Sequence, residues 1–340
     1  MKTALITGIS GQDGFFLSRL LLQQGYDVHG FIRRNSQASV GTLESLSDSE
    51  RKKITIHWGD ISDHTIVESV VREGQYNEIY HLAAQSFVWL SFTNPSATYQ
   101  TNIDGTLNLV NAIKTFSPQS KFYFAGTSEM FGKSPAPQNE TTPFYPRSPY
   151  GISKLAAYWT TKNYRESYQL FMSNGILFNH ESEMRGAEFV TRKITQGVAS
   201  IANGSTEPLI LGNLDAKRDW GYATDYTEAM WRILQHHEPD DFVIATGISH
   251  TVREFVEQAF LGIGITIAWE GTGVSETGKN AKDGRLLVQI DQKLYRPAEV
   301  DDIRGDAQKA KNLLRWEPTV SFEELVAVMV KTDLARIKHP

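Results

Sequence analysis

The sequence contains no cysteine, no excess of positive charge and no long apolar run, and each absence removes a class of function. Without cysteine among its 340 residues, the chain has no disulfide framework, thiolate catalysis or cysteine-ligated metal. Its formal net charge of −5 provides no basic field for nucleic acid or a membrane surface. No apolar run reaches the ~18 residues of a membrane span, and the first residues have the pattern of a strand instead of a signal peptide. We therefore expect a soluble cytoplasmic protein with no metal site, nucleic-acid partner or membrane partner.

Short apolar runs alternate with helical patterns through the first half of the chain. The runs that indicate strands are residues 3–7, 27–32, 53–58, 78–81, 122–125 and 172–177. Helical periodicity covers residues 15–24, 65–73, 96–116 and 150–168. This alternation predicts an α/β fold built on a doubly wound parallel Rossmann sheet with right-handed crossovers.

The pattern changes after residue 178, and the length of the chain suggests about two domains. We expect residues 1–178 to form a dinucleotide-binding domain and residues 179–340 to form mostly a smaller C-terminal substrate-binding domain. Within the second part, the sequence predicts helices at 189–202 and 321–335 and a loop or short strand at 209–219. An apolar run near 242–247 is expected to return to the sheet as a further strand.

Three glycines lie between the first predicted strand and the first predicted helix. Gly8, Gly11 and Gly14 have the spacing GxxGxxG, which differs from the GxGxxG fingerprint of dinucleotide-binding folds. The physical basis is shared, because glycines permit a tight turn and let a pyrophosphate approach the start of a helix. A plain tight turn is the alternative, but the order of strand, glycine turn and helix favours a nucleotide site.

The end of the second predicted strand carries Arg33 and Arg34, about 20 residues past the glycines. An acidic residue here would bind the ribose 2′-hydroxyl of NAD, whereas a pair of guanidinium groups suits a 2′-phosphate. We therefore predict NADP, with two solvated arginines as the alternative. After the third strand, Asp60 could accept a hydrogen bond from the adenine amino group, and we assign Asp63 to the N-cap of the helix at 65–73.

A polar trio, Thr127, Ser128 and Glu129, follows the buried run at 122–125, where an open α/β sheet binds its ligands. Tyr150 and Lys154 follow at the start of a helix, and their spacing places them on one helix face. A free phenol has a pKa of about 10, and a neighbouring ammonium lowers it. Tyr150 could then act as a general base toward a substrate hydroxyl. An ordinary surface pair is the alternative, and the trio and glycine turn argue against it.

Longer strings of residues connect the chain to a known family. They are ALITGISGQDG at 4–14, HGFIRRNS at 29–36, the trio at 127–129, TTPFYPRSPYGISK at 141–154, NGILFNHES at 174–182, FVTRK at 189–193, LGNLDAKRDWG at 211–221 and YRPAEVD at 295–301. On these strings, the chain resembles the GDP-mannose 4,6-dehydratases of the extended short-chain dehydrogenase/reductase group. The resemblance spans nearly the whole chain and includes strings outside the shared cofactor motifs.

The resemblance implies roles for individual residues. The catalytic set would be Thr127, Glu129 and Tyr150, with Lys154 assisting the tyrosine. The implied contacts to NADP are Gly8, Gly11, Gln12, Asp13, Gly14, Arg33, Arg34, Asn35, Ser36, Asp60, Ile61, Leu82, Ala83, Ala84, Gln85, Ser86, Lys154, His180 and Arg185. The implied contacts to GDP-mannose are Ser86, Ser128, Glu129, Asn179, Lys193, Arg218, Arg296 and Glu299. The family also implies a homo-oligomer, a dimer or a tetramer.

The reaction that the resemblance implies is the conversion of GDP-mannose to GDP-4-keto-6-deoxymannose and water. Tyr150 takes the proton of the sugar O4 hydroxyl while hydride leaves C4 for NADP⁺, and Thr127 orients O4. The ketone acidifies the C5 hydrogen, so Glu129 can remove that proton and help the C6 hydroxyl depart as water. Hydride then returns to C6 and a proton to C5, which regenerates the cofactor.

The chain departs from the family pattern at several positions. The family's SPRRG is SEMRG at 182–186, which removes one positive charge and a proline. Ala97 stands in place of a tyrosine that contacts the cofactor, and Thr42 in place of an arginine of the intersubunit loop. Phe87 and Trp89 replace more polar residues. These changes affect cofactor and subunit contacts, and the catalytic set is intact.

Three other functions compete with dehydration of GDP-mannose. An NADPH-dependent reductase of a GDP-4-keto-6-deoxy sugar would share Tyr150 and Lys154 but would not need Glu129. A 4,6-dehydratase of UDP- or dTDP-sugars would not need the strings at 211–221 and 295–301. A non-catalytic protein that senses NADP would have no use for the three side chains together. The downstream pathway of the product is not contained in the sequence.

Overall fold

A seven-stranded parallel sheet forms the centre of the protein, in a computed structural model that describes residues 1–295, 298, 300 and 302–338. The strand order is β11–β6–β5–β4–β1–β2–β3. The strands are β1 (Thr3–Thr7), β2 (Asp27–Ile32), β3 (Ile54–Trp58), β4 (Glu78–His81), β5 (Lys121–Thr127), β6 (Met172–Leu177) and β11 (Asp241–Ile244). The expected α/β fold with a doubly wound parallel sheet is confirmed.

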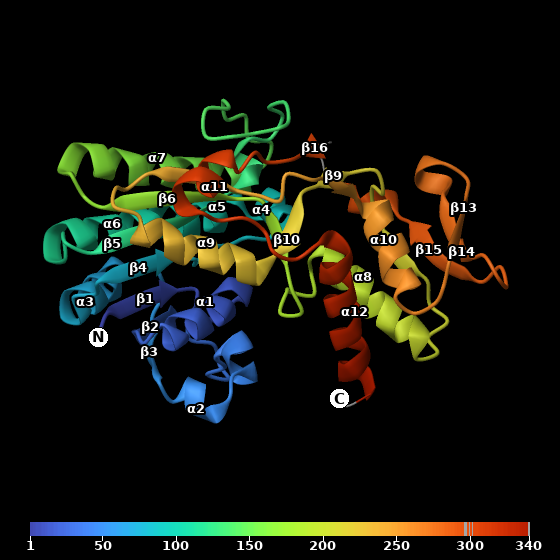
Figure 1. Cartoon of the computed structure of the whole chain (residues 1–340), viewed down its shortest axis with the longest axis horizontal. Helices are drawn as coiled ribbons and strands as arrows, with labels where there is room; N and C mark the ends of the chain where they lie inside the picture. The colour runs from blue at the N-terminus through green and yellow to red at the C-terminus, as the bar shows by residue number, and fades with distance from the viewer. Residues whose placement is uncertain (296–297, 299, 301, 339–340) are drawn as a thin grey trace.

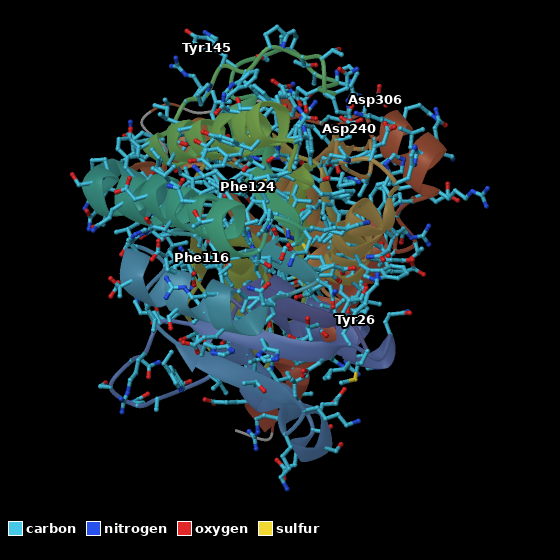
Figure 2. All side chains as sticks on the ribbon, turned by 90° about the vertical axis from the view of Figure 1, so that its left-hand side faces the viewer. Tyr26, Phe116, Phe124, Tyr145, Asp240 and Asp306 are labelled. Carbon is cyan, nitrogen blue, oxygen red and sulfur yellow. The ribbon has the colours of Figure 1, made fainter. Side chains whose placement is uncertain are left out.

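Helices cover both faces of this sheet (Figure 1). One face carries α1 (Gln12–Gln23), α9 (Ala223–Gln235) and α11 (Gln308–Leu314), whose apolar residues share a core with β1 and β2. The other face carries α3 (His64–Gly74), α6 (Gly105–Phe116) and α7 (Pro149–Tyr168). Figure 2 shows Phe124 of β5 in the interior and Tyr145, on the loop between β5 and α7, at the outer surface.

Local hydrogen bonds set where the helices near the sheet edge begin. The Asp63 carboxylate accepts from the backbone N–H groups of Thr65 (3.0 Å) and Ile66 (3.3 Å), so its predicted role as the N-cap of α3 is confirmed. Ser148 caps α7 by accepting from the Gly151 N–H at 3.0 Å, and Pro149 occupies the first helical position. The Ser148 cap and Pro149 therefore fix the residue at which α7 begins, and with it the position of Tyr150 in the first turn.

The helix predicted over 96–116 is interrupted. It consists of α5 (Pro95–Tyr99), a π-helical turn (Gln100–Asp104) and α6. In this turn, the Asn102 side chain exchanges hydrogen bonds with the backbone of Gln85 (2.8 and 3.1 Å) and donates to the Ser153 hydroxyl (2.9 Å). The wider turn therefore ties the segment after β4 to α7.

A smaller group of elements lies to the right of the sheet in Figure 1. It contains β8 (Leu209–Leu211), β13 (Ile267–Glu270), β14 (Thr277–Asn280) and β15 (Leu286–Ile290), with α8 (Val190–Ala202), α10 (Val252–Leu261) and α12 (Phe322–Lys338). These elements enclose their own apolar core. We had not predicted this sheet, because strands of three to five residues with partial exposure have too little periodicity to stand out.

Short strands connect the two parts. β7 (Asn179–Glu181) pairs with β10 (Trp220–Tyr222), and β9 (Lys217–Arg218) lies between β12 (His250–Thr251) and β16 (Asp302–Ile303). The remaining short helices are α2 (Asp48–Arg51), α4 (Val88–Thr93) and single 3-10 turns at 41–45, 128–130, 273–275 and 292–294. We propose the domain division at 178/179, with β11 and its flanking helices α9 and α11 returning to the sheet domain. Among the described residues, no helix combines the length and apolarity needed to cross a membrane.

Candidate active site

The glycine turn lies at the carboxyl end of β1 and leads directly into α1. Gly8 has a φ of +73°, and a Cβ there would lie 2.7 Å from the Ala83 nitrogen. A Cβ at Gly14 would lie 2.3 Å from the Ile9 carbonyl oxygen. Gly11 is the N-cap of α1 and has no side chain to cover the first turn. No side chain therefore caps the first N–H groups of α1, which leaves this helix start suited to an anion.

A hydrogen-bonded group beside this turn involves Gln12, Asp13 and His180. The Gln12 side chain donates to the His180 carbonyl (3.0 Å) and accepts from the Ser182 hydroxyl (2.7 Å). His180 places Nε2 at 2.9 Å from the Asp13 carboxylate and Nδ1 at 2.8 Å from the Phe178 carbonyl. Both ring nitrogens face acceptors, and this geometry favours the doubly protonated ring. Burial opposes a charge on the ring, but the charge and hydrogen bond of Asp13 and the hydrogen bond to the Phe178 carbonyl together raise the pKa of His180.

The segment proposed for the adenosine end is exposed. Residues 33–36 follow β2 and all lie at the surface. Asp60, after the neighbouring strand β3, accepts from the backbone N–H (2.9 Å) and hydroxyl (2.7 Å) of Ser62. Burial raises the pKa of Asp60, but these hydrogen bonds and the charge of Arg33 together lower it. The structure thus brings Arg33 and Asp60 to one sheet edge.

The segment after β4 packs against the glycine turn. The N–H groups of Leu82 and Ala83 bind the carbonyl (3.1 Å) and hydroxyl (3.2 Å) of Thr7. The Gln85 side chain turns inward and donates to the Thr98 hydroxyl at 3.0 Å. Ser86 is exposed. The backbone of this segment therefore lines the glycine turn, and the amide of Gln85 is engaged within the protein.

The predicted catalytic residues lie together and are shielded from solvent. Thr127, Glu129 and Tyr150 are 9%, 7% and 8% exposed. The Thr127 hydroxyl accepts from the Glu129 N–H at 3.3 Å and hydrogen-bonds the Tyr150 phenol. Ser128 is buried between them in the chain. Lys154 is also buried, and its ammonium donates to the Ala125 carbonyl of β5 at 2.7 Å.

The electrostatics of this group differ from the expectation. Burial raises the pKa of Tyr150 to about 12, with Glu129 adding to the rise while Thr127 and Arg185 oppose it. Burial also lowers the pKa of Lys154 to about 7, against the charge of Asp13. The sequence predicts that Lys154 lowers the pKa of Tyr150. In the protein alone, desolvation outweighs any such effect, because both groups are removed from water.

A cavity of about 270 Å³ opens beside α8 and β9. Its lining includes Arg185 and three of the residues predicted to hold the substrate, Asn179, Lys193 and Arg218. Burial lowers the pKa of Lys193. The Arg218 guanidinium is buried and donates to the Val300 carbonyl at 2.8 Å. The lining does not include the other predicted substrate contacts that the structure describes, Ser86, Ser128 and Glu129; Arg296 and Glu299 lie outside the described residues.

Sequence reasoning missed the aromatic wall of this cavity. Phe87 and Phe189 meet edge to face at 5.9 Å, and Trp89 and Trp220 also line the cavity. The Arg185 guanidinium lies 3.6 Å from the centre of the Phe189 ring. In the sequence, the aromatic residues at positions 87 and 89, where the family has polar ones, were the feature that could have indicated this wall. Only the fold shows that Phe87 and Trp89 lie beside α8.

Comparisons with known proteins show the family and the fold of the whole chain. Residues 5–329 match the model of the family described as GDP-mannose 4,6 dehydratase. The chain is 53% identical over 342 residues to the GDP-mannose 4,6 dehydratases of Cricetulus griseus and Homo sapiens, covering 98% of this chain and 91% of each relative. A solved UDP-glucose 4-epimerase from Thermotoga maritima superposes with a TM-score of 0.82 at 24% identity, covering 99% of this chain and 100% of that chain. At this identity, the structural likeness shows the shared fold.

Proposed function

The chain belongs to the GDP-mannose 4,6-dehydratase family, and from this premise we propose how its residues carry out the reaction. It is an enzyme of nucleotide-sugar metabolism, a hydro-lyase that removes water from GDP-mannose. The observation that supports our assignment of roles is the shared burial of Thr127, Glu129 and Tyr150, with Tyr150 within reach of the charge of Asp13 at the start of α1. Arg185 links this group to the cavity, because it lines the cavity and its charge lowers the pKa of Tyr150.

The cofactor that fits the glycine turn is a nicotinamide dinucleotide, and we propose NADP. Gly8 lies so close to the Ala83 backbone that a side chain at position 8 would not fit, so only backbone lines the turn at this point. The start of α1 offers N–H groups to a pyrophosphate. Arg33 and Arg34 are exposed at the edge where a 2′-phosphate would lie. When bound, the cofactor would supply the acceptor for the C4 hydride and return that hydride to C6.

Tyr150 acts on the O4 proton of the sugar. With a pKa of about 12 in the protein alone, about one phenol in 10⁵ is ionised at pH 7. Phenolate must therefore be stabilised as it forms. The hydrogen bond of Thr127 and the charge of Arg185 favour the phenolate, and Glu129 opposes it. The hydroxyl of Thr127 also orients O4.

Glu129 acts on the next bond. It takes the C5 proton, and the electron pair of that C–H bond forms the C5–C6 double bond as the C6–O bond breaks. The proton then leaves with the C6 hydroxyl as water. A positioned acid or base of this kind contributes about 10²–10⁴-fold. A simple reductase of a 4-keto sugar has no such step, so Glu129 favours the dehydratase.

The cationic side of the cavity would hold the diphosphate of GDP-mannose. Lys193 and Arg218 lie in its lining with Arg185, and Asn179 offers an amide to the sugar or phosphate. Guanidinium and ammonium groups out of bulk water bind phosphate through charge-assisted hydrogen bonds. We propose Arg296 and Glu299 as further contacts on the grounds of the family resemblance.

We also propose that the enzyme is a homo-oligomer. Ile152 and Trp159 lie on one face of α7 and are 45% and 51% exposed, and Leu107 of the adjacent α6 is 39% exposed. A second copy of the chain would cover these apolar side chains. Light scattering of the purified protein measures the mass, and a monomer at micromolar concentration would contradict this proposal. The cytoplasmic location stays a prediction.

The experiment that tests the function is mass spectrometry of purified protein incubated with GDP-mannose, with and without added NADP⁺. We expect a product lighter by one water and no net formation of NADPH. If no water is lost, the 4-keto product with NADPH should be offered next, followed by UDP- and dTDP-sugars, because these distinguish the competing functions.

A further inference from the structure

The segment at 182–189 joins β7 to α8 and carries Arg185, and two arginines meet at one of its carbonyl groups. Arg192 of α8 donates to the Glu183 carbonyl at 2.5 Å, and Arg336 of α12 donates to the same oxygen at 2.7 Å. The two helices pack side by side (Figure 1). Arg192 also reaches the Arg185 carbonyl at 3.3 Å.

A buried carboxylate holds these two arginines in place. Asp333 of α12 is 3% exposed and forms an ion pair with Arg192 at 2.7 Å. Its second oxygen accepts from the Thr195 hydroxyl at 2.7 Å, and Arg336 lies 3.5 Å from the first. Arg192 and Arg336 therefore connect the segment at 182–189 to α12, and Asp333 holds both side chains in position.

Other contacts attach the same segment to its surroundings. The Tyr222 phenol donates to the Glu183 carboxylate at 3.2 Å, and Arg336 lies 3.8 Å from the Met184 sulfur. Glu183 and Met184 are the positions at which the chain departs from the family's proline and arginine. The backbone conformation that a proline would restrict is here held by side chains of α8, α12 and β10.

On the inner side of the segment, the Arg185 guanidinium is fixed between two partners. It lies 3.6 Å from the centre of the Phe189 ring and 3.0 Å from the Glu181 carboxylate. Its backbone is held from outside by Arg192, while its side chain lines the cavity. Movement of the 183 and 185 carbonyls would therefore move the guanidinium.

The grouping of charges indicates that stability alone does not explain both arginines. Burial lowers the pKa of Arg192, Asp333 raises it and Arg336 lowers it further. Two guanidinium groups thus lie beside the Asp333 carboxylate and repel each other, and the charge of Glu183 offsets only part of this. The Arg336 side chain is 42% exposed, and an ion pair made by such an exposed group contributes little net stability. The second arginine is better explained by what it does to the carbonyl it binds.

We propose that Arg192 and Arg336 are positioning residues that fix Arg185 for binding of the GDP-sugar, an inference that rests on the proposed function of the cavity. The family resemblance assigns Arg185 to NADP, and its place in the cavity lining is the reason for assigning it to the GDP-sugar as well. Loss of one of them would allow the segment to move and would weaken binding of GDP-mannose. The chemical groups Glu129 and Tyr150 lie on other elements, η3 (Ser128–Met130) and α7. The main effect should therefore fall on KM and the dissociation constant, and a smaller loss of kcat should accompany it because the charge of Arg185 favours the Tyr150 phenolate.

The test uses the full-length Arg336→Met variant, because Arg336 is half exposed and methionine keeps the length of its stem. We expect the dissociation constant for GDP-mannose, measured by calorimetry on the holoenzyme, to rise about tenfold, which corresponds to about 1.4 kcal/mol. The melting temperature should not fall. Amide hydrogen exchange should accelerate within residues 182–189. Arg336→Lys, which retains one donor for the Glu183 carbonyl, should show an intermediate affinity.

Arg232→Met is the matched control. Arg232 of α9 donates to the carbonyls of Leu314 (3.0 Å) and Arg315 (2.7 Å) and pairs with Glu228, so it makes the same kind of contact without touching the segment. It should leave the affinity for GDP-mannose unchanged. The proposal is overturned if Arg336→Met binds GDP-mannose as the wild type does, or if both variants lose affinity in proportion to lost stability. If the wild type itself fails to bind GDP-mannose, the proposed function fails, and unchanged exchange at 182–189 in Arg336→Met would separately overturn the positioning role.

Discussion

Gly8 and Gly25 have nearly equal φ angles, +73° and +76°, but very different surroundings. Gly8 lies in the turn proposed for the pyrophosphate, and Gly25 follows α1. A Cβ at Gly8 would meet the nitrogen (2.7 Å) and Cα (2.8 Å) of Ala83, whereas a Cβ at Gly25 would have nothing within 4 Å. Replacing each glycine by alanine therefore separates backbone strain from steric exclusion.

The magnitudes follow from these distances. A left-handed conformation costs an L-residue about 1–2 kcal/mol, which is the whole effect expected for Gly25→Ala. For Gly8→Ala, the contacts with Ala83 involve backbone atoms that cannot rotate away, so overpacking adds about 1–3 kcal/mol. We expect Gly8→Ala to lower the free energy of unfolding by about 2–5 kcal/mol, and Gly25→Ala by about 1–2 kcal/mol.

Urea unfolding of the two variants measures the difference, and calorimetry with NADP⁺ measures the consequence at the turn. Gly8→Ala should weaken cofactor binding, because the Cβ displaces the 82–84 segment or the turn itself. Gly25→Ala should bind NADP⁺ as the wild type does. Equal destabilisation of the two variants, with equal affinity for NADP⁺, would refute the close approach of the turn to Ala83 as the reason for glycine at position 8.

Three further predictions concern charged residues of the site. Glu129→Gln should retain GDP-mannose binding in calorimetry but lower dehydration by about 10²–10⁴-fold in the mass-spectrometric assay; undiminished turnover would exclude Glu129 as the base. Arg34→Ala should weaken NADP about tenfold or more while affecting NAD much less, as expected for a lost charge-assisted hydrogen bond; equal losses would show that the arginine does not bind the 2′-phosphate. The pKa of Lys154 is about 7 in the folded protein, whereas its unperturbed value is 10.5. Between these two pH values, the unfolded chain binds more protons than the folded one. The free energy of unfolding should therefore rise with pH across this window. Lys154→Met should remove this rise in urea titrations, and an unchanged slope would contradict the burial of the ammonium.

The order of strands and helices could be predicted because it follows from apolar runs and helical periodicity in neighbouring residues. Strand boundaries at 27–32 and 78–81 coincide with β2 and β4, since an apolar run between turns needs no distant information to be recognised. The N-cap at Asp63 and the shared helix face of Tyr150 and Lys154 are likewise consequences of spacing along the chain. Family strings added the roles of these residues but not their environment.

The environment of the site depended on contacts between residues far apart in the sequence. His180 meets Asp13 across 167 positions, Arg336 meets Glu183 across 153, and Lys154 meets the Ala125 carbonyl across 29. The smaller sheet escaped prediction because its short strands gain their order from pairing partners and not from periodicity.

The sequence by itself determined the alternation of elements, the glycine turn and the residues available for chemistry, because these follow from local backbone preference and side-chain type. The tertiary structure decided which of them are buried together, which way the ammonium of Lys154 points and how far the pKa values of Tyr150 and Lys154 move. Burial and partner choice are properties of three-dimensional packing, and desolvation, which is the largest cause of both pKa shifts, exists only once the chain has folded.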